Sequence, residues 1–95
     1  MPTLQVEHPV PDYDAWKAAF DGDPIGRRRS GVRRYRVMRP VGEPHYVVIH
    51  LDFDSLGEAE SAQAALRALW TRVDVMHEPR SRIVETLEER EYSPR

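Results

Sequence analysis

The sequence predicts an α+β fold in which six short elements follow one another as strand, helix, strand, strand, helix, strand. Three observations predict this order: segments with a hydrophobic period of two, segments with apolar residues three or four apart, and breaks rich in Pro or Gly between them. The chain has 95 residues, which suffices for one hydrophobic core. We therefore expect a single domain over residues 1–95.

The first strand and the first helix are predicted within residues 3–20. Apolar and polar residues alternate over residues 3–8, and Pro9 ends this strand because proline cannot donate to a ladder. Asp12 is the predicted N-cap of the helix that follows. The apolar stripe of this helix consists of Tyr13, Trp16 and Phe20.

The second and third strands are predicted to form a hairpin. Residues 32–39 alternate cleanly, with Arg34 and Arg36 on one face and Tyr35 and Val37 on the other. A loop over residues 40–44 contains two prolines and a glycine, which is typical of a hairpin turn. The third strand, over about residues 45–53, is apolar on both faces, as a central strand is.

The second helix is predicted to begin after Asp54 or Ser55 as its N-cap, and Ser55 could form a capping box with Glu58. The buried stripe of this helix consists of Ala59, Ala62, Leu66, Leu69, Trp70 and Val73. Residues 82–87 alternate again and predict the fourth strand. The acidic residues 88–95 are expected to form a frayed tail.

This element order predicts a ferredoxin-like topology. Right-handed crossovers place both helices on one face of a four-stranded antiparallel sheet, with the first and third strands at its centre. The helices then leave the other face of the sheet open. By parity, the open face carries Thr3, Gln5, Glu7, Val32, Arg34, Arg36, Met38, Tyr46, Val48, His50, Asp52, Arg82, Val84 and Thr86.

The open face mixes apolar side chains with charges of both signs, which predicts that a second copy of the chain covers it. In such a homodimer, Arg34 and Arg36 are expected either to pair with Glu7 and Asp52 across the interface or to stay hydrated, because burying unpaired ions is costly. The predicted interface is centred on Arg34, Arg36, Tyr46, Val48 and His50.

The composition argues against several functions. The chain contains no cysteine, so thiolate catalysis and thiolate-ligated metals are excluded. The net charge of −2 argues against nucleic acid as the main partner, and the aromatic platform of RNA-binding ferredoxin-like domains is missing. The sequence has neither the pattern of a signal peptide nor an apolar run of the ~20 residues that a membrane span needs. We therefore expect a cytoplasmic protein without a membrane partner.

Arginines are concentrated between residues 27 and 39 of the sequence. The first three, Arg27-Arg28-Arg29, fall in a predicted loop. Two interpretations of this run stay open. It is either a solvated surface or a site that grips a phosphate or a carboxylate.

The four histidines are the residues expected to titrate near neutral pH. They lack the spacing of metal ligands, so we expect neither a metal site nor a cofactor. His8 is the first candidate for a general acid-base, because its parity points toward the helices and it lies at a strand end beside Pro9. His77, in the loop before the last strand, is the second candidate.

A pocket between the helices and the sheet is expected to bind a small apolar or aromatic substrate. The residues predicted to bind it are Trp16, Tyr35, Phe53 and Trp70. His8, Met76 and His77 would complete the lining of this pocket. The alternative is that the same aromatic side chains fill a closed core.

Two segments carry a family resemblance. The first is Gly31-Val32-Arg33-Arg34-Tyr35-Arg36-Val37-Met38-Arg39, and the second is Leu51-Asp52-Phe53-Asp54-Ser55-Leu56-Gly57-Glu58-Ala59. Together they resemble the dimeric α/β-barrel superfamily, and most closely its antibiotic-biosynthesis-monooxygenase-like branch. The shared features are a strand of the Gly-hydrophobic-x-x-Tyr kind, an aromatic residue at a strand end, and an Asp/Glu-Ser-x-x-x-Ala helix start. Phe53 stands where many members carry Trp.

The resemblance implies a dimer whose two sheets face each other as a barrel, with a cavity between helices and sheet in each subunit. Members of the superfamily include cofactor-free oxygenases, haem-degrading enzymes, polyketide cyclases and isomerases. We therefore expect a cofactor-independent monooxygenase or cyclase that acts on an aromatic or polyketide-like substrate. The alternative is a non-catalytic dimeric domain that binds a ligand or a protein.

One branch of the superfamily degrades haem, and its residue pattern can be compared with this sequence. The haem-degrading branch has an Asn on its first strand, a Trp, and a His ligand on a helix. Here the first strand carries Gln5, Glu7 and His8 but no Asn, and His77 precedes Pro79 in a predicted loop. Because of this departure, haem degradation is not the expected activity.

Overall fold

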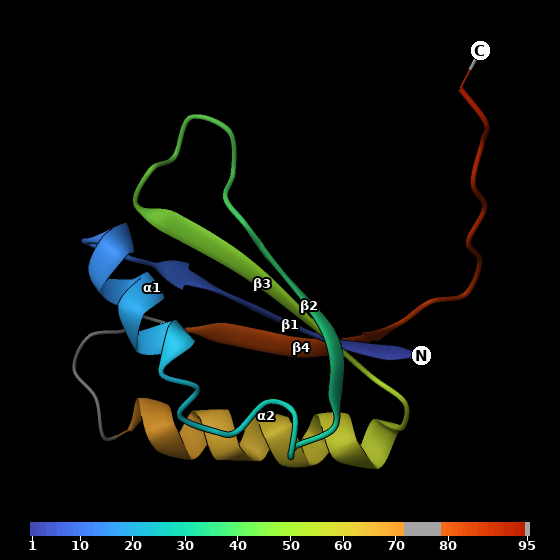
Figure 1. Cartoon of the computed structure of the whole chain (residues 1–95), viewed down its shortest axis with the longest axis horizontal. Coiled ribbons are helices and arrows are strands. Elements are labelled where there is room, and N and C mark those ends of the chain that lie inside the picture. Colours follow the sequence, from blue (N-terminus) through green and yellow to red (C-terminus); the bar gives the residue numbers. More distant parts are fainter. Residues whose placement is uncertain (72–78, 95) are drawn as a thin grey trace.

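The computed structural model describes residues 1–71 and 79–94 and confirms the predicted order of elements (Figure 1). The elements are β1 (Pro2–Pro9), α1 (Tyr13–Asp21), β2 (Val32–Met38), β3 (Tyr46–Phe53), α2 (Leu56–Trp70) and β4 (Arg80–Glu85). The four strands form one antiparallel sheet in the order β2-β3-β1-β4, so β1 and β3 are central, as predicted.

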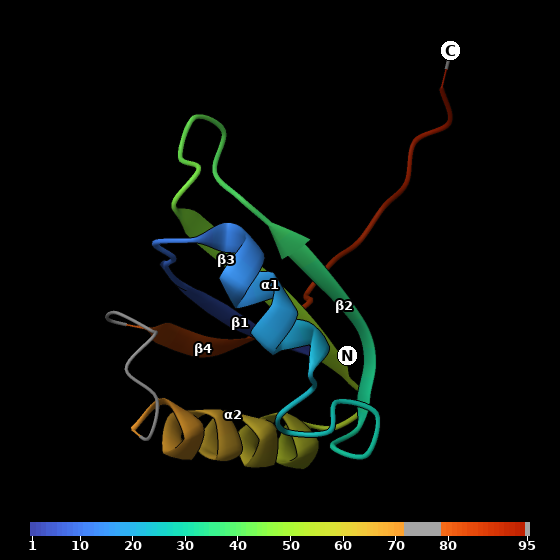
Figure 2. The same cartoon turned by 60° about the vertical axis from the view of Figure 1, so that its left-hand side comes forward.

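Side chains alternate strictly between the two faces of the central strands. On β1, Leu4, Val6 and His8 are buried, and on β3 the same is true of every second residue from Val47 to Phe53. These side chains form one cluster with Trp16 of α1 and with alanines of α2, so both helices lie on this covered face (Figure 2). The two unlike faces predicted from the sequence are therefore confirmed.

Both helices begin at the predicted caps. The Asp12 side chain accepts a hydrogen bond from the Ala15 N–H at 3.3 Å. At the start of α2, Ser55 Oγ accepts from the Glu58 N–H at 3.2 Å and donates to Glu58 Oε1 at 3.0 Å, which completes the capping box. Each cap satisfies an N–H group that has no partner within its own helix.

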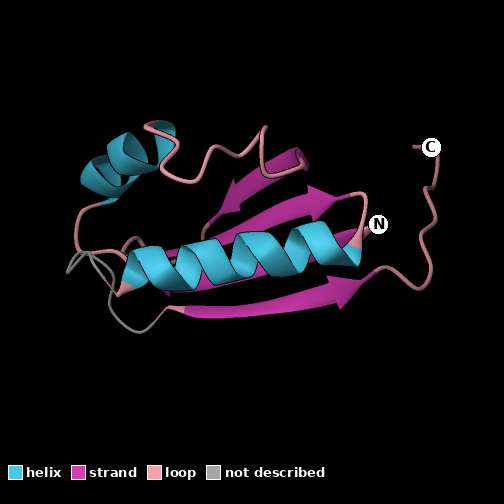
Figure 3. Cartoon of the chain, turned by 90° about the horizontal axis from the view of Figure 1, so that it is seen from below, coloured by secondary structure: helices cyan, strands magenta, loops and turns pink. Residues whose placement is uncertain are grey.

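Helix α2 runs along the sheet and meets it in two different ways (Figure 3). In its first half, Ala59 and Ala62 are buried against the strands, and their small size allows close contact. In its second half, Leu66, Leu69 and Trp70 are only half-buried. The second half therefore leaves space between helix and sheet.

Strand β2 departs from the predicted alternation at one point. Its register with β3 shifts between Val32 and Arg34, so Val32 lies opposite Phe53 and Arg34 opposite Asp52. Arg33 is the extra residue of this bulge. As a result, Val32 packs against the core. Its predicted position on the open face is wrong, because counting alternate residues along a strand cannot detect an inserted residue.

The C-terminal part of the chain differs slightly from the prediction. Strand β4 spans Arg80–Glu85, so it begins and ends two residues before the predicted strand. Residues 86–94 are exposed, form no helix or strand, and extend away from the sheet (Figure 1). Within the described residues, neither helix has the length and apolarity needed to cross a membrane.

Gly31 generates a prediction about stability. Its φ is +98°, and a Cβ at this position would collide with the carboxylate of Glu58, which belongs to the capping box of α2. We expect Gly31→Ala to lower the free energy of unfolding by about 1–3 kcal/mol. Gly57→Ala is the matched control, because nothing lies near its Cβ, and we expect a gain of up to about 1 kcal/mol. Urea unfolding compares the two, and an unchanged or raised stability of Gly31→Ala would contradict the argument.

Candidate binding cleft between the helices and the sheet

An apolar cleft of about 500 Å³ lies between the two helices and the covered face of the sheet. This volume is in the range of small-molecule sites, roughly 300–1,000 Å³. The strands, the residue after β1 and α2 supply one group of lining residues, which are Val6, His8, Val10, Ile49, Leu51, Leu66, Leu69 and Trp70. Helix α1 and its flanking loops supply the other group, which are Pro11, Asp12, Ala15, Trp16, Ala19, Phe20, Pro24, Ile25 and Arg27.

His8 is the polar residue most deeply buried at the cleft. It is 0 % exposed, and its Nδ1 lies 3.0 Å from the carbonyl oxygen of Pro9. Because a carbonyl oxygen only accepts, Nδ1 carries the proton in this hydrogen bond and Nε2 of the neutral ring carries a lone pair. Burial lowers the pKa of His8 below 6.5, and the hydrogen bond to Pro9 opposes this only in part. The imidazole is therefore neutral at neutral pH.

Two buried polar atoms of the cleft residues lack hydrogen-bond partners within the part of the chain that the structure describes. They are Nε2 of His8, an acceptor, and Nε1 of Trp70, a donor. Leaving a buried donor or acceptor unpaired costs about 1–3 kcal/mol. His8 and Trp70 both line the cleft, and these two atoms of theirs are themselves buried.

Aromatic rings form the wall of the cleft on the side of α1. The ring of Trp16 lies 5.9 Å from the His8 ring and is stacked on Phe20 at 5.1 Å. The guanidinium carbon of Arg27 lies 4.0 Å above the centre of the Phe20 ring. The wall therefore extends from His8 past two aromatic rings to Arg27.

The structure brings together only some of the residues that were predicted to bind substrate. His8, Trp16 and Trp70 all line the cleft. Phe53 is 0 % exposed within the core, and Tyr35 packs edge-on behind Phe20 and is 46 % exposed, so neither belongs to the lining. Met76 and His77 lie outside the described residues, and the role of His77 remains a prediction.

Sequence reasoning missed two kinds of lining residue. Phe20, Leu66 and Leu69 were assigned to the core, although their helical spacing from Trp16 and Trp70 already placed them on the same stripes. Arg27 was predicted to lie in a loop that is either a solvated surface or an anion-binding site. No sequence signal indicates that this loop folds back over α1, which the hydrogen bond from Arg27 Nη1 to the Phe20 carbonyl oxygen at 2.7 Å establishes.

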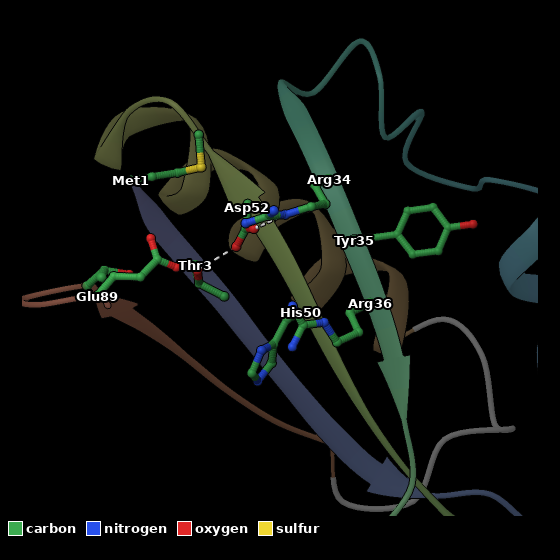
Figure 4. Close-up of a pocket in the computed structure, with 9 residues that line it drawn as sticks. Met1, Thr3, Arg34, Tyr35, Arg36, His50, Asp52 and Glu89 are labelled. Atoms are coloured by element: carbon green, nitrogen blue, oxygen red, sulfur yellow. Dashed lines mark hydrogen bonds and ion pairs between the residues drawn. The ribbon is translucent and has the colours of Figure 1, made fainter. Parts of the chain in front are cut away.

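The predicted interface residues lie on the open face, where Arg34, Arg36 and His50 surround a shallow polar hollow of about 340 Å³ (Figure 4). Tyr35 points away from them. Arg34 Nε donates to Asp52 Oδ2 at 2.9 Å within one chain, because β2 and β3 place the two residues directly opposite. This pair is therefore already formed within one chain, and its formation across a dimer stays a prediction.

Two acidic residues of the open face have internal partners. Burial raises the pKa of Asp52, but hydrogen bonds from Thr3 at 2.6 Å and from Arg34 outweigh it, so the net pKa lies below 3.8. Glu7 accepts a hydrogen bond from the Tyr46 hydroxyl at 3.0 Å. Burial, followed by this hydrogen bond, raises the pKa of Tyr46 above 10.0. Both of these carboxylates therefore have hydrogen-bond donors within their own chain.

The described residues do not reproduce the donor set of the haem-degrading branch. Gln5 and Glu7 pair with His50 and Val48, so they lie on the open face, away from the cleft. His77 lies outside the described residues, and within them no group of three His, Asp or Glu side chains is arranged to hold a metal ion. The described residues therefore do not fit the donor set of that branch.

The burial of His8 generates a prediction about pH. The folded protein holds His8 with a pKa below the 6.5 of the unfolded chain, so on acidification the unfolded chain takes up the proton first. We expect the stabilising contribution to be complete above pH 6.5 and to be lost as pH falls toward the folded-state pKa. Urea midpoints on both sides of pH 6.5 should show a steeper acid loss for the wild type than for His8→Gln. His45→Gln, at an exposed histidine, should keep the wild-type slope.

Comparisons with known proteins bear on the fold. No protein-family profile matches the sequence, and no curated protein matches it. A dimeric ferredoxin-like protein from an uncultured marine organism superposes with a TM-score of 0.69 at 9 % identity, over 97 % of this chain and 100 % of that chain. A Nitrosomonas europaea protein, named as a candidate antibiotic biosynthesis monooxygenase, reaches 0.61 at 18 % identity over 93 % and 100 % of the two chains.

A third similar structure is that of MhuD, solved with manganese protoporphyrin IX in its active site. It superposes with a TM-score of 0.60 at 14 % identity, over 97 % of this chain and 100 % of that chain. Identities this low are informative about the fold alone. The chain shares the ferredoxin-like fold of these dimeric and antibiotic-biosynthesis-monooxygenase-like proteins.

Proposed function

We propose that the protein binds an aromatic or polyketide-like molecule in the cleft and acts as a cofactor-independent monooxygenase or cyclase. The observation that carries this proposal is that His8 and Trp70 line the same apolar cleft, while His8 Nε2 and Trp70 Nε1–H have no hydrogen-bond partner within the described residues. The name of the Nitrosomonas europaea structure with this fold is consistent with the proposal.

In the proposed mechanism, His8 is the general base. Its Nε2 removes a proton from an acidic C–H group next to a carbonyl of the substrate, and the resulting imidazolium keeps its Nδ1–H hydrogen bond to the Pro9 carbonyl oxygen. Trp70 Nε1–H donates to the carbonyl oxygen, on which negative charge develops. The apolar walls exclude water, which strengthens both interactions.

The carbanion then reacts in one of two ways. In a monooxygenase it adds to O₂ and forms a peroxide anion, which takes the proton back from His8. His8 then removes the second C–H proton, the O–O bond breaks, and a ketone and a hydroxide ion form. The hydroxide takes the proton from His8 and becomes water. The balance is R₂CH₂ + O₂ → R₂C=O + H₂O. In a cyclase the carbanion attacks a second carbonyl of the same molecule, and the alkoxide takes the proton back from His8.

Turnover of anthrone, a tricyclic ketone with an acidic methylene group, tests this function. We expect oxygen uptake and anthraquinone formation, and we expect His8→Ala to lower kcat by about 10²–10⁴-fold. Trp70→Phe keeps the ring and removes the donor, so we expect a smaller loss of about tenfold or more. His45→Ala is the control, because His45 is exposed in the hairpin loop. Undiminished turnover by His8→Ala would remove His8 from the mechanism, and binding without turnover would favour a ligand-binding domain.

We also propose that the protein is a homodimer formed through the open face. Two of the similar structures are described as dimeric ferredoxin-like proteins. On the open face, Met38 lies opposite Val48, and Val84 is 38 % exposed, so apolar groups adjoin the charged residues of this face. Arg36 has no ion pair within the described residues, and in a dimer it would be available to an acidic group of the second copy.

Sedimentation at micromolar concentration tests the dimer. We expect a mass of twice the 11.0 kDa of the chain. Val48→Glu places a charge at the centre of the face and should shift the protein toward the monomer, because a buried unpaired charge costs several kcal/mol. Val41→Glu, at a fully exposed position of the hairpin loop, should leave the mass unchanged. A wild-type mass near one chain would contradict the proposal.

A further inference from the structure

We propose that Arg27 is the anchor for an anionic group of the ligand, so that the cleft takes an aromatic or polyketide-like carboxylic acid. This inference deepens the proposed function and rests on it. Arg27 is the cationic residue among those that line the cleft, and its side chain is only 16 % exposed. A cation buried to this degree in an apolar site is stabilised by a matching anion.

Several contacts hold the guanidinium group of Arg27 in place. It lies 4.0 Å above the Phe20 ring and 5.0 Å from the centre of the Tyr35 ring. Its Nη1 donates to the Phe20 carbonyl oxygen at 2.7 Å, near the C-terminus of α1. A guanidinium that is already oriented loses little conformational freedom when it binds a carboxylate, so the site is preorganised.

The charge of Arg27 is poorly compensated. The carboxylate of Asp23 lies 3.6 Å from Nη1, and its Oδ1 accepts the backbone N–H of Arg27 at 2.8 Å instead. The guanidinium has five N–H groups, and within the described residues one of them donates a hydrogen bond, to the carbonyl oxygen of Phe20. Arg34, by contrast, donates directly to a carboxylate at 2.9 Å. Arg27 therefore retains donors for a bidentate partner.

The positions of His8 and Arg27 determine the shape of the ligand. His8 packs on Trp16, and Arg27 packs on Phe20, which follows Trp16 by about one turn of α1. A ligand that meets both residues has a flat apolar body against the two rings. It carries a neutral hydroxyl or enol at the His8 end and a carboxylate at the Arg27 end.

A purely structural role for Arg27 makes a different prediction. Capping of α1 and stacking on Phe20 account for the Nη1 hydrogen bond and for the position of the side chain. Such a role would change stability when Arg27 is replaced, but it would not favour an acidic ligand over a neutral one. The preference between two isosteric ligands therefore separates the two roles.

The experiment compares 6-hydroxy-2-naphthoate with its neutral isostere 6-hydroxy-2-naphthamide, with Kd read from the quenching of tryptophan fluorescence. We expect the wild type to bind the acid at least about tenfold more tightly than the amide, as a hydrogen-bonded charge pair provides. In Arg27→Gln this preference should fall to near unity, whereas Arg27→Lys, which keeps the charge, should retain part of it. Arg28→Gln, at an exposed neighbouring arginine, should leave the preference unchanged.

The outcomes distinguish this inference from the proposed function. If the wild type binds acid and amide equally, or if Arg27→Gln keeps the preference, the role of Arg27 is overturned while aromatic binding in the cleft stands. If neither naphthalene binds, the cleft is not a site for such molecules and both proposals are overturned. The wild-type comparison needs no variant, so it decides even if Arg27→Gln fails to fold.

Discussion

The antiparallel pairing of β1 with β3 is the constraint on which the rest of the structure depends. Its register places Leu4 opposite Leu51 and His8 opposite Val47, so the same face of both strands is apolar. A slip by one residue would turn Leu4 and His8 to the open face and bring polar residues to the helices. The site therefore depends on this register, because the parity that buries Leu4 also brings His8 to the cleft.

The cleft exists because the helices do not close evenly on the sheet. Alanines in the first half of α2 allow close packing, whereas Leu66 and Trp70 in the second half stand over a cavity. The protein keeps a buried, neutral imidazole there and leaves its Nε2 without a partner in the described chain. Such an arrangement lowers stability, and unsatisfied buried groups of this kind are a feature of functional sites.

The arginines of the chain have distinct roles that their spacing does not reveal. Arg33 is the extra residue of the β2 bulge and pairs with Asp54 at 3.3 Å, and Arg34 follows it and pairs with Asp52 at 2.9 Å. Arg27 lies only six positions before Arg33, yet it packs on Phe20 and Tyr35 at the cleft. The Arg34–Asp52 pair lies on the open face of the sheet, whereas the guanidinium of Arg27 lies at the cleft on the covered face.

The sequence by itself determined the order of elements, both helix caps, and the inward direction of His8, Trp16 and Trp70. These features are local: a period of two or 3.6 residues sets the direction of a side chain relative to its own backbone. Only the tertiary structure decided that Val32 enters the core through a bulge, and that Phe53 is sealed away from the cleft. It also decided that Arg27 reaches the Phe20 ring. Such distances depend on loop closure and on how far the helices stand from the sheet, which no periodicity encodes.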